Sequence, residues 1–280
     1  MSIKLKQFKS YHKLYKNWLH VLYSIHNMST QDNKINLKLR NGKTQSIELK
    51  DIFDYTFKNY YVSPDGCVKI NNFKFKLNNG DSEIYNGDIG ATFIKEDYKW
   101  LKPKENTVID IGANIGDSSI YFAWKGAKQV IALEPYPYSY KLAMENILIN
   151  GFNEKIFLLN AGYGKNGEMI VGDQVTGTGN ELVSSKKGTP IKIYSIKTLL
   201  EKYRLDSVLL KMDCEGCEYN LLNEDDNTLK KIKRIQIEYH YGYERLKNKL
   251  EGLGFKVRYT EPVVGAENKN MYMGYIYARQ

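Results

Sequence analysis

The 280-residue chain has only three cysteines and no long apolar run. So few cysteines cannot form a scaffold held by disulfides, which agrees with a reducing compartment. No segment approaches the roughly 18 to 20 apolar residues of a membrane span. Lys and Tyr interrupt the first 26 residues too often for a signal peptide. We therefore expect a cytoplasmic protein without a transmembrane segment.

Two of the cysteines, Cys214 and Cys217, form a C-x-x-C pair. A redox pair is expected at a helix N-terminus beside the first strand of a thioredoxin-like unit, and a zinc site needs a second pair. The sequence offers neither context. We therefore predict neither a redox nor a zinc role for this pair.

The chain carries a net charge of +9, much of it near the start, where residues 1–60 hold eleven Lys and Arg but only four Asp and Glu. Such a segment can attract a lipid surface, a nucleic acid or a phosphorylated acceptor. A solvated basic face is the simpler interpretation, and the one we prefer. Weak peripheral membrane contact and oligomer formation stay open, and we expect no nucleic-acid partner.

The first 84 residues are predicted to form an N-terminal appendage. Apolar and aromatic residues recur every three or four positions over 5–27, which predicts one amphipathic helix. Residues 35–80 shift to strand-like stretches separated by Asn-Gly and Asn-Asn pairs, which are typical hairpin turns. We predict a helix and a small β-hairpin subdomain, followed by the main domain at 85–280.

From Thr107 onward, strand patterns alternate with helix patterns, which predicts an α/β fold with a doubly wound, mostly parallel sheet. Strands are predicted at 107–111, 129–134, 155–160, 207–212, 233–238, 255–260 and 271–278, with two further strands, 168–172 and 190–194, in a loop-rich insertion. Helices are predicted at 117–126, 138–150, 196–203, 217–231 and 241–252.

The most informative segment is VIDIGANIGDSS, residues 108–119. Its apolar start suits a buried parallel strand, and Gly112 and Gly116 allow a tight turn that brings the backbone close to a ligand. The next strand, QVIALE, ends in Glu134, where a carboxylate can accept both hydroxyls of a ribose. We therefore expect a ligand that contains ribose.

The spacing of this turn departs from the dinucleotide fingerprint G-x-G-x-x-G, because Asn114 stands where a second glycine is required. Asp110, two residues before the first glycine, would repel a pyrophosphate and attract an ammonium or sulfonium group. S-adenosylmethionine combines ribose, amine and sulfonium, and is the predicted cofactor.

Four segments occur in the order of the FkbM family of class I S-adenosylmethionine-dependent methyltransferases, and the chain resembles that family over roughly residues 85–278. These segments are DIGANIG at 110–116, ALEP at 132–135, LNAG at 159–162 and LKMDCEGCE at 210–218. Cys214 departs from the pattern, because a valine or another small apolar residue is more usual there. The resemblance implies a Rossmann-like sheet of seven strands, the last antiparallel, and methyl transfer with oxygen as the favoured atom.

The cofactor-binding residues that we predict come from these segments. Asp110 is expected on the amine side of the cofactor, directly or through water, Glu134 on the ribose, and Asn160 and Ala161 near the adenine. Each of these residue types also favours caps and turns, but their joint spacing supports the cofactor interpretation. The other predicted cofactor residues are Gly112, Ala113, Asn114, Gly116, Asp117, Ser118 and Pro135.

The acceptor side is predicted from two neighbouring strand ends that carry four carboxylates and one imidazole: Asp213, Glu215, Glu218, Glu238 and His240. We take His240 as the general base, Asp213 or Glu238 as the group that orients it, and Glu215 as a ligand of acceptor hydroxyls. The alternative is that Glu218 caps a helix and His240 is a satisfied polar residue. Crowded carboxylates should raise a pKa or invite a cation. We considered magnesium on Asp213 and Glu238, but expect no metal.

The segment Val175 to Gly188 is rich in Gly, Ser and Thr. It is either an acceptor loop that orders on binding or a plain surface loop. The sequence thus predicts a methyltransferase acting on a hydroxyl of a small molecule or glycan. The alternatives are an NAD-dependent oxidoreductase or nucleotide-sugar enzyme, and a non-catalytic binding protein on the same fold.

Overall fold

The computed structural model describes residues 5–27, 34–77, 88–173, 181–264 and 271–280. The chain divides into two compact units, Met1–Asp97 and Tyr98–Gln280. The first unit includes the π-helical turn Ala91–Lys95, whereas the sequence analysis begins the main domain at residue 85.

The N-terminal unit combines short helices with two hairpins. Its elements are α1 (Leu5–Leu14), α2 (Trp18–His26), β1 (Lys34–Lys38), β2 (Thr44–Glu48), η1 (Leu49–Asp51), α3 (Ile52–Tyr61), β3 (Val68–Ile70), β4 (Phe73–Phe75) and η3 (Ala91–Lys95). The hairpins β1–β2 and β3–β4 follow the prediction. The turn predicted around Asn79 lies outside the described residues.

Two predictions for this unit are wrong. The single helix over 5–27 is broken at Tyr15, which instead forms an antiparallel bridge to Leu39. The helix α3 lies within residues 35–80, for which the sequence analysis predicts only strands and turns. Its buried residues Ile52, Thr56 and Phe57 lie on one helical face, and burial of that face explains the helix.

The C-terminal unit contains the predicted alternation of strands and helices. Its elements are η4 (Asp97–Leu101), β5 (Thr107–Ile111), α4 (Asp117–Trp124), β6 (Gln129–Leu133), α5 (Pro137–Ile149), β7 (Ile156–Leu159), β8 (Ala161–Tyr163), β9 (Gly167–Val171), β10 (Thr189–Tyr194), α6 (Ile196–Lys202), β11 (Val208–Met212), η5 (Cys217–Asn223), α7 (Asp226–Leu229), β12 (Ile232–Tyr239), α8 (Glu244–Gly252), β13 (Lys256–Tyr259), β14 (Val263–Val264) and β15 (Tyr272–Arg279).

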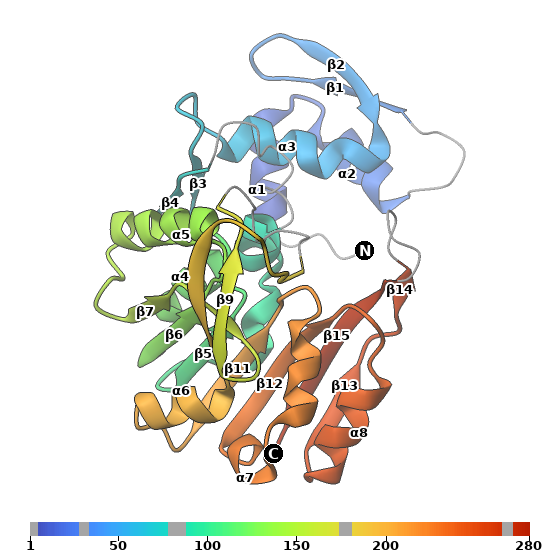
Figure 1. The fold of residues 1–280 in the computed structure, drawn as a ribbon. Coiled ribbons are helices and arrows are strands. Elements are labelled where there is room, and N and C mark those ends of the chain that lie inside the picture. The colour runs from blue at the N-terminus through green and yellow to red at the C-terminus, as the bar shows by residue number, and fades with distance from the viewer. Residues whose placement is uncertain (1–4, 28–33, 78–87, 174–180, 265–270) are drawn as a thin grey trace. The chain divides into compact units, whose positions relative to one another are not determined.

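The main sheet has the strand order β13-β15-β12-β11-β5-β6-β7, with β14 paired to β15 (Figure 1). Strands β12, β11, β5, β6 and β7 pair in parallel, and β15 is antiparallel to both of its neighbours β12 and β13. The seven-stranded path with an antiparallel last strand confirms the predicted fold class. A smaller sheet, β8-β10-β9, is formed by the insertion; β8 was not predicted.

Burial of the central strands places the polar residues that follow them at one edge of the sheet. All five residues of β5 and all five of β11 are buried. Five of them share one apolar core with residues of β12 and β15: Ile109, Ile111, Val208, Leu210 and Met212. In a parallel sheet, the carboxyl ends of neighbouring strands meet at the same edge, which is where ligands bind. The segments after β5, β6, β11 and β12 are therefore brought together.

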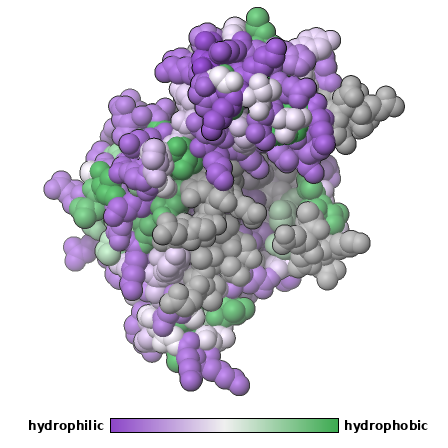
Figure 2. All heavy atoms as spheres, turned by 90° about the horizontal axis from the view of Figure 1, so that it is seen from above, coloured by the Kyte–Doolittle hydropathy of each residue, from purple (hydrophilic) through white to green (hydrophobic). Residues whose placement is uncertain are grey.

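The surface visible in the space-filling view is mostly hydrophilic, with apolar residues in small separate patches (Figure 2). None of the helices in the part of the chain that the structure describes has the length and apolar character needed to span a bilayer.

Candidate active site

The glycine turn after β5 is held tightly against the segment that follows β11. Gly112 has a φ of +80°, and a Cβ atom there would lie 1.8 Å from the backbone carbonyl oxygen of Asp213. Only glycine fits at such a position. The backbone N–H groups of Gly112 and Ala113 both donate to Leu133 O, at 3.1 and 2.9 Å. The turn therefore links the ends of β5, β6 and β11.

Asp110 is buried on β5 and is held by three neighbouring side chains. Its side chain is fully buried and accepts hydrogen bonds from Ser118 Oγ and Ser119 Oγ at 2.7 and 2.6 Å. Its other oxygen, Oδ1, lies 3.2 Å from Lys211 Nζ, an ion pair without the alignment of a hydrogen bond. Asp110 therefore links β5 to the start of α4 and to β11. Its contact with the cofactor amine, directly or through water, stays a prediction.

Glu134 follows β6 and holds two loops by their backbones. Its Oε2 accepts the Asn114 N–H at 2.8 Å, and its Oε1 accepts the Tyr136 N–H at 3.0 Å. Burial raises the pKa of Glu134 from 4.5 to about 7, against the opposing effect of these two donors. Each oxygen keeps a further lone pair that can accept a ribose hydroxyl.

The remaining predicted cofactor residues surround the same place. Asn160 donates its side-chain amide to the backbone carbonyls of Glu134 and Pro135, at 3.0 and 2.9 Å, so it fixes the loop after β6. Asp117 and Ser118 open α4, after Gly116, and are buried. Gly112, Pro135 and Ala161 line a narrow hollow together with Ile111, Leu133, Gly162, Tyr163, Leu182, Cys214 and Cys217. Its free volume is about 20 Å³, enough for one water but not for a nucleoside.

The predicted catalytic residues meet around His240. The His240 Nε2 atom lies 3.0 Å from Glu215 Oε2, and Nδ1 lies 3.0 Å from Glu218 Oε1. Burial alone would lower the pKa of the imidazole. The hydrogen bonds and negative charges of Glu215 and Glu218 outweigh burial, and raise that pKa to about 11.

Glu215 and Glu218 contact the ring of His240. Asp213, one of the two residues predicted to orient it, accepts a hydrogen bond from Tyr98 Oη at 3.2 Å. A role for Asp213 or Glu238 in orienting the ring stays a prediction. Burial, then the charge of Asp213, raise the pKa of Glu238 from 4.5 to about 8, as expected for crowded carboxylates.

Glu215 has a strained backbone. Its φ of +52° lies in the left-handed region, which costs a glutamate roughly 1–3 kcal/mol and which proteins retain mainly at functional sites. The next residue, Gly216, also has a positive φ, of +105°. This turn directs the chain from β11 into η5, and places Glu215 at the wall of a larger cavity.

The larger cavity has a volume of about 380 Å³. Its wall includes the charged or amide side chains of Lys165, Glu168, Glu181, Glu215 and Asn220. It shares Tyr163, Leu182 and Cys217 with the narrow hollow, so the two spaces adjoin. Glu181 and Leu182 come from the loop predicted to bind the acceptor; residues 175–180 of that loop lie outside the described residues.

Two features of the site were not predicted. Lys211 is buried with an exposed fraction of 2%, and a lysine inside the apolar run LLKM was the available signal, because a charge on a buried strand needs a partner. Cys214 and Cys217 are joined by a disulfide. The C-x-x-C spacing was the available signal, but the sequence analysis considers only redox and zinc roles for the pair and predicts neither.

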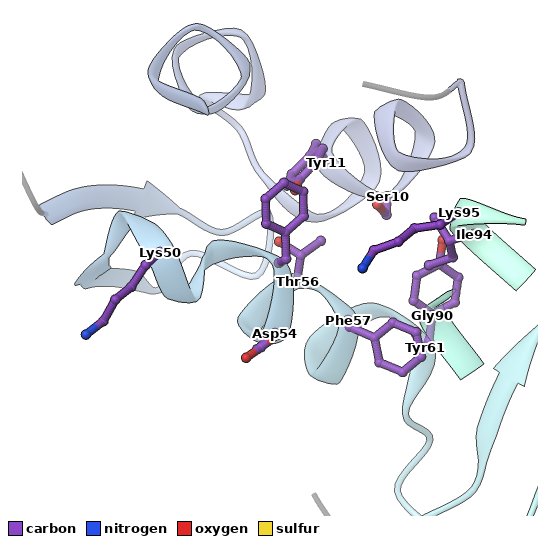
Figure 3. Close-up of a pocket in the computed structure, with 11 residues that line it drawn as sticks. Ser10, Tyr11, Lys50, Asp54, Thr56, Phe57, Tyr61, Gly90, Ile94 and Lys95 are labelled. Atoms are coloured by element: carbon purple, nitrogen blue, oxygen red, sulfur yellow. The ribbon is translucent and has the colours of Figure 1, made fainter. Parts of the chain in front are cut away.

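A separate cavity of about 220 Å³ lies entirely in the N-terminal unit (Figure 3). Its lining residues come from α1, from η1 and α3, and from the segment Gly90 to Lys95 (Figure 3). None of the residues predicted for cofactor binding or catalysis lines it. We therefore do not include it in the candidate active site.

Comparison with known proteins gives the family. The profile described as the methyltransferase FkbM domain matches residues 110–257. A Methanocaldococcus jannaschii protein with the provisional name protein N5-glutamine methyltransferase is 28% identical over 197 residues, covering 68% of this chain and 88% of that protein. An uncharacterized protein of Sulfolobus islandicus rod-shaped virus 1 is 29% identical over 143 residues, covering 51% of this chain and 66% of its own length.

Among solved structures, M. jannaschii TYW2 in complex with AdoMet has a TM-score of 0.43 and 22% identity, and the alignment covers 76% of this chain and 84% of that one. The FkbM profile covers more than half of the chain, including the glycine turn, Glu134 and the residues around His240. The chain therefore belongs to the FkbM methyltransferase family.

Proposed function

We propose that this protein transfers a methyl group from S-adenosylmethionine to a hydroxyl oxygen of a small molecule or glycan. The observation that supports this most strongly is the adjacency of the narrow hollow and the larger cavity, which share Tyr163, Leu182 and Cys217. Methyl transfer is an in-line displacement, so the donor carbon and the acceptor oxygen must be held next to each other.

The residues of the hollow suit S-adenosylmethionine. Leu133, Pro135 and Ala161 provide apolar walls for an adenine, and Glu134 provides oxygens for the ribose. The cofactor supplies a methyl group bound to a sulfonium, and the carbon of that methyl group is the electrophile. Because the free volume is only about 20 Å³, the hollow must widen before the cofactor enters, and we expect the side chain of Leu182 to move.

The larger cavity suits a polar acceptor. Its volume of about 380 Å³ lies within the usual range for small-molecule sites, roughly 300–1,000 Å³. Carboxylates and an amide on its wall can hydrogen-bond several hydroxyls of a sugar or a hydroxylated metabolite. Acceptors that lack these hydroxyls would leave such polar groups without partners and should bind more weakly.

Glu215, rather than His240, is best placed to contact the reacting hydroxyl. Both ring nitrogens of His240 face carboxylate oxygens at 3.0 Å, so both act as N–H donors in this arrangement. Glu215 lines the cavity. In the reaction, a C–O bond forms and the C–S bond breaks with its electron pair kept by sulfur, while the hydroxyl proton passes to the carboxylate of Glu215. His240 then acts as a positioning residue.

The first experiment is isothermal titration of the full chain with S-adenosylhomocysteine, with NAD and NADP as parallel controls. Micromolar binding of S-adenosylhomocysteine alone is expected, and Glu134→Ala should abolish it. Preference for NAD would contradict the proposal, although membership in a methyltransferase family already argues against the oxidoreductase alternative.

The second experiment follows a labelled methyl group from S-adenosylmethionine into hydroxylated metabolites, glycans and a glutamine-containing peptide. The peptide is included because of the name of the M. jannaschii relative. We expect label in a hydroxylated acceptor, lost in Glu215→Gln with cofactor binding retained. Label only in the glutamine amide would contradict methyl transfer to oxygen. Cofactor binding without any turnover would favour the non-catalytic alternative.

A further inference from the structure

Three side chains of the candidate active site converge on one point. Asp213 and Glu215 follow β11, and His240 follows the neighbouring parallel strand β12. One ligand atom from each lies within 4.8 Å of the other two, and His240 Nε2 lies 3.0 Å from Glu215 Oε2. In an octahedral site with bonds of about 2.1 Å, neighbouring ligand atoms are about 3.0 Å apart and opposite ones about 4.2 Å. The cluster therefore needs only a small contraction to hold an ion.

A fourth side chain fixes the imidazole from behind. Glu218 is fully buried, and its Oε1 accepts both the backbone N–H and the Nδ1–H of His240, each at 3.0 Å. Its Oε2 accepts the backbone N–H of Gly216 at 2.9 Å. A histidine that binds a metal commonly donates its other ring N–H to a carboxylate in this way, which presents the second nitrogen to the metal.

We propose that Asp213, Glu215 and His240 bind one divalent cation of the Mn²⁺ type beside the acceptor cavity. Two carboxylate oxygens suit Mg²⁺ and Mn²⁺, and an imidazole nitrogen favours the first-row metal over Mg²⁺. The inference revises the sequence prediction of no metal. It also replaces the pair Asp213 and Glu238, because Glu238 is not one of the three converging ligands.

The position of the ion gives it a role in methyl transfer, and this part rests on the proposed function. Glu215 lines the acceptor cavity, so coordination positions not filled by protein can face an acceptor. A hydroxyl oxygen bound there becomes more acidic and loses its proton to solvent. The oxygen then forms the C–O bond, and the C–S bond breaks with its electron pair kept by sulfur. Glu215 would then act as a metal ligand and no longer receive the proton.

The test is a titration of the full chain, freed of metals with a chelator, with Mn²⁺ followed by electron paramagnetic resonance. One bound Mn²⁺ per chain is expected, with modulation of the signal by a coordinated imidazole nitrogen. His240→Gln should remove that modulation and, like Asp213→Asn, weaken binding by at least about tenfold. Glu218→Gln, which changes only the supporting carboxylate, should weaken binding roughly 10- to 100-fold.

Glu201→Gln is the matched control, since Glu201 is an exposed carboxylate on α6, and it should bind Mn²⁺ like the wild type. If Asp213→Asn or His240→Gln does not fold, Glu215→Gln is used in its place and should also weaken Mn²⁺ binding. The Glu215 side chain is 20% exposed and lies at the cavity wall, so its substitution should disturb the fold less. The proposal is overturned by no binding at millimolar Mn²⁺, or by a nitrogen signal that persists in His240→Gln.

Each titration is repeated with S-adenosylhomocysteine present. Mn²⁺ binding without affinity for S-adenosylhomocysteine would retain the metal site and refute the proposed function. Affinity for S-adenosylhomocysteine without Mn²⁺ binding would refute the metal site and leave the proposed function standing. The two proposals therefore fail separately.

Discussion

Lys211 on β11 is the registered partner of Asp110 on β5, and their side chains form an ion pair of 3.2 Å with exposed fractions of 2% and 0%. Burial would lower the pKa of the Lys211 ammonium, but the charge of Asp110, followed by that of Asp213, outweighs burial and raises it. Lys211 also donates to the backbone carbonyl of Gly112 at 2.6 Å. The acidic residue that marks the cofactor turn is thus neutralised within the protein.

Removing both partners of this pair should destabilise the fold by less than the sum of the two separate removals. Asp110→Asn leaves a buried ammonium without its counter-ion, and we expect a loss of about 3–5 kcal/mol in the free energy of unfolding. The double variant Asp110→Asn, Lys211→Met should lose less than the sum of the two single variants. Urea unfolding measures all four proteins. Strict additivity would show that the two charges do not interact.

Glu134 should make cofactor affinity depend on pH. Because its pKa is about 7 in the folded protein, raising the pH through 7 ionises the carboxylate, and an ionised carboxylate accepts ribose hydroxyls better. The affinity for S-adenosylhomocysteine should rise between about pH 6 and pH 8. Titration calorimetry at both values checks this, and Glu134→Gln should show weaker binding without the trend. Equal affinities in the wild type would refute it.

Glu134 should also make the stability of the fold depend on pH, but here a rise in pH lowers the free energy of unfolding. Between pH 4.5 and 7 the folded protein holds a proton on Glu134 that the unfolded chain releases, so the free energy of unfolding falls as the pH rises. The loss amounts to about 3 kcal/mol above pH 7. Relative to wild type, Glu134→Gln should therefore gain stability as the pH rises through this range. Parallel urea curves for the two proteins across the range would contradict this.

Leu182 should limit entry of the cofactor. Leu182→Ala enlarges the hollow, and we expect a several-fold higher association rate for S-adenosylhomocysteine, measured by stopped-flow fluorescence. The neighbouring Val183 has an exposed fraction of 59% and does not line the hollow, so Val183→Ala is the matched control and should leave the rate unchanged. Equal rates in wild type and Leu182→Ala would mean that the hollow opens by another movement.

The disulfide between Cys214 and Cys217 should stabilise the protein modestly. It closes a very short loop, for which the chain-entropy relation gives about 2 kcal/mol. A reducing agent should lower the free energy of unfolding of the wild type by this amount and leave the double variant Cys214→Ser, Cys217→Ser unchanged. A wild type that does not respond would indicate that the two thiols are free in solution.

The sequence was sufficient to place the buried strands, because burial requires a run of apolar residues that can be recognised. The apolar runs before Gly112 and at Gln129 to Leu133 were placed within one residue of the observed strands, because a strand buried on both faces is apolar throughout. The break at Tyr15 had no such signal. It depends on pairing with Leu39, a contact between residues distant in sequence.

The sequence predicted that Glu215 and His240 lie close together, but not which atoms of the two side chains meet. Residues that end parallel strands are brought together by the topology, which is why His240 and Glu215 could be placed in one site. Which carboxylate contacts which ring nitrogen depends on the left-handed turn at Glu215 and on the burial of Glu218. Neither property can be deduced from residue type alone.

The strand β15 is the last in sequence, yet it lies inside the sheet, between β12 and β13. During synthesis, neither of those strands can complete its pairing until the ribosome has passed Arg279. The nascent chain therefore keeps β12 and β13 with an unpaired edge until β15 has been made, and a premature stop codon before Tyr272 would remove hydrogen bonds from β12, β13 and β14 together.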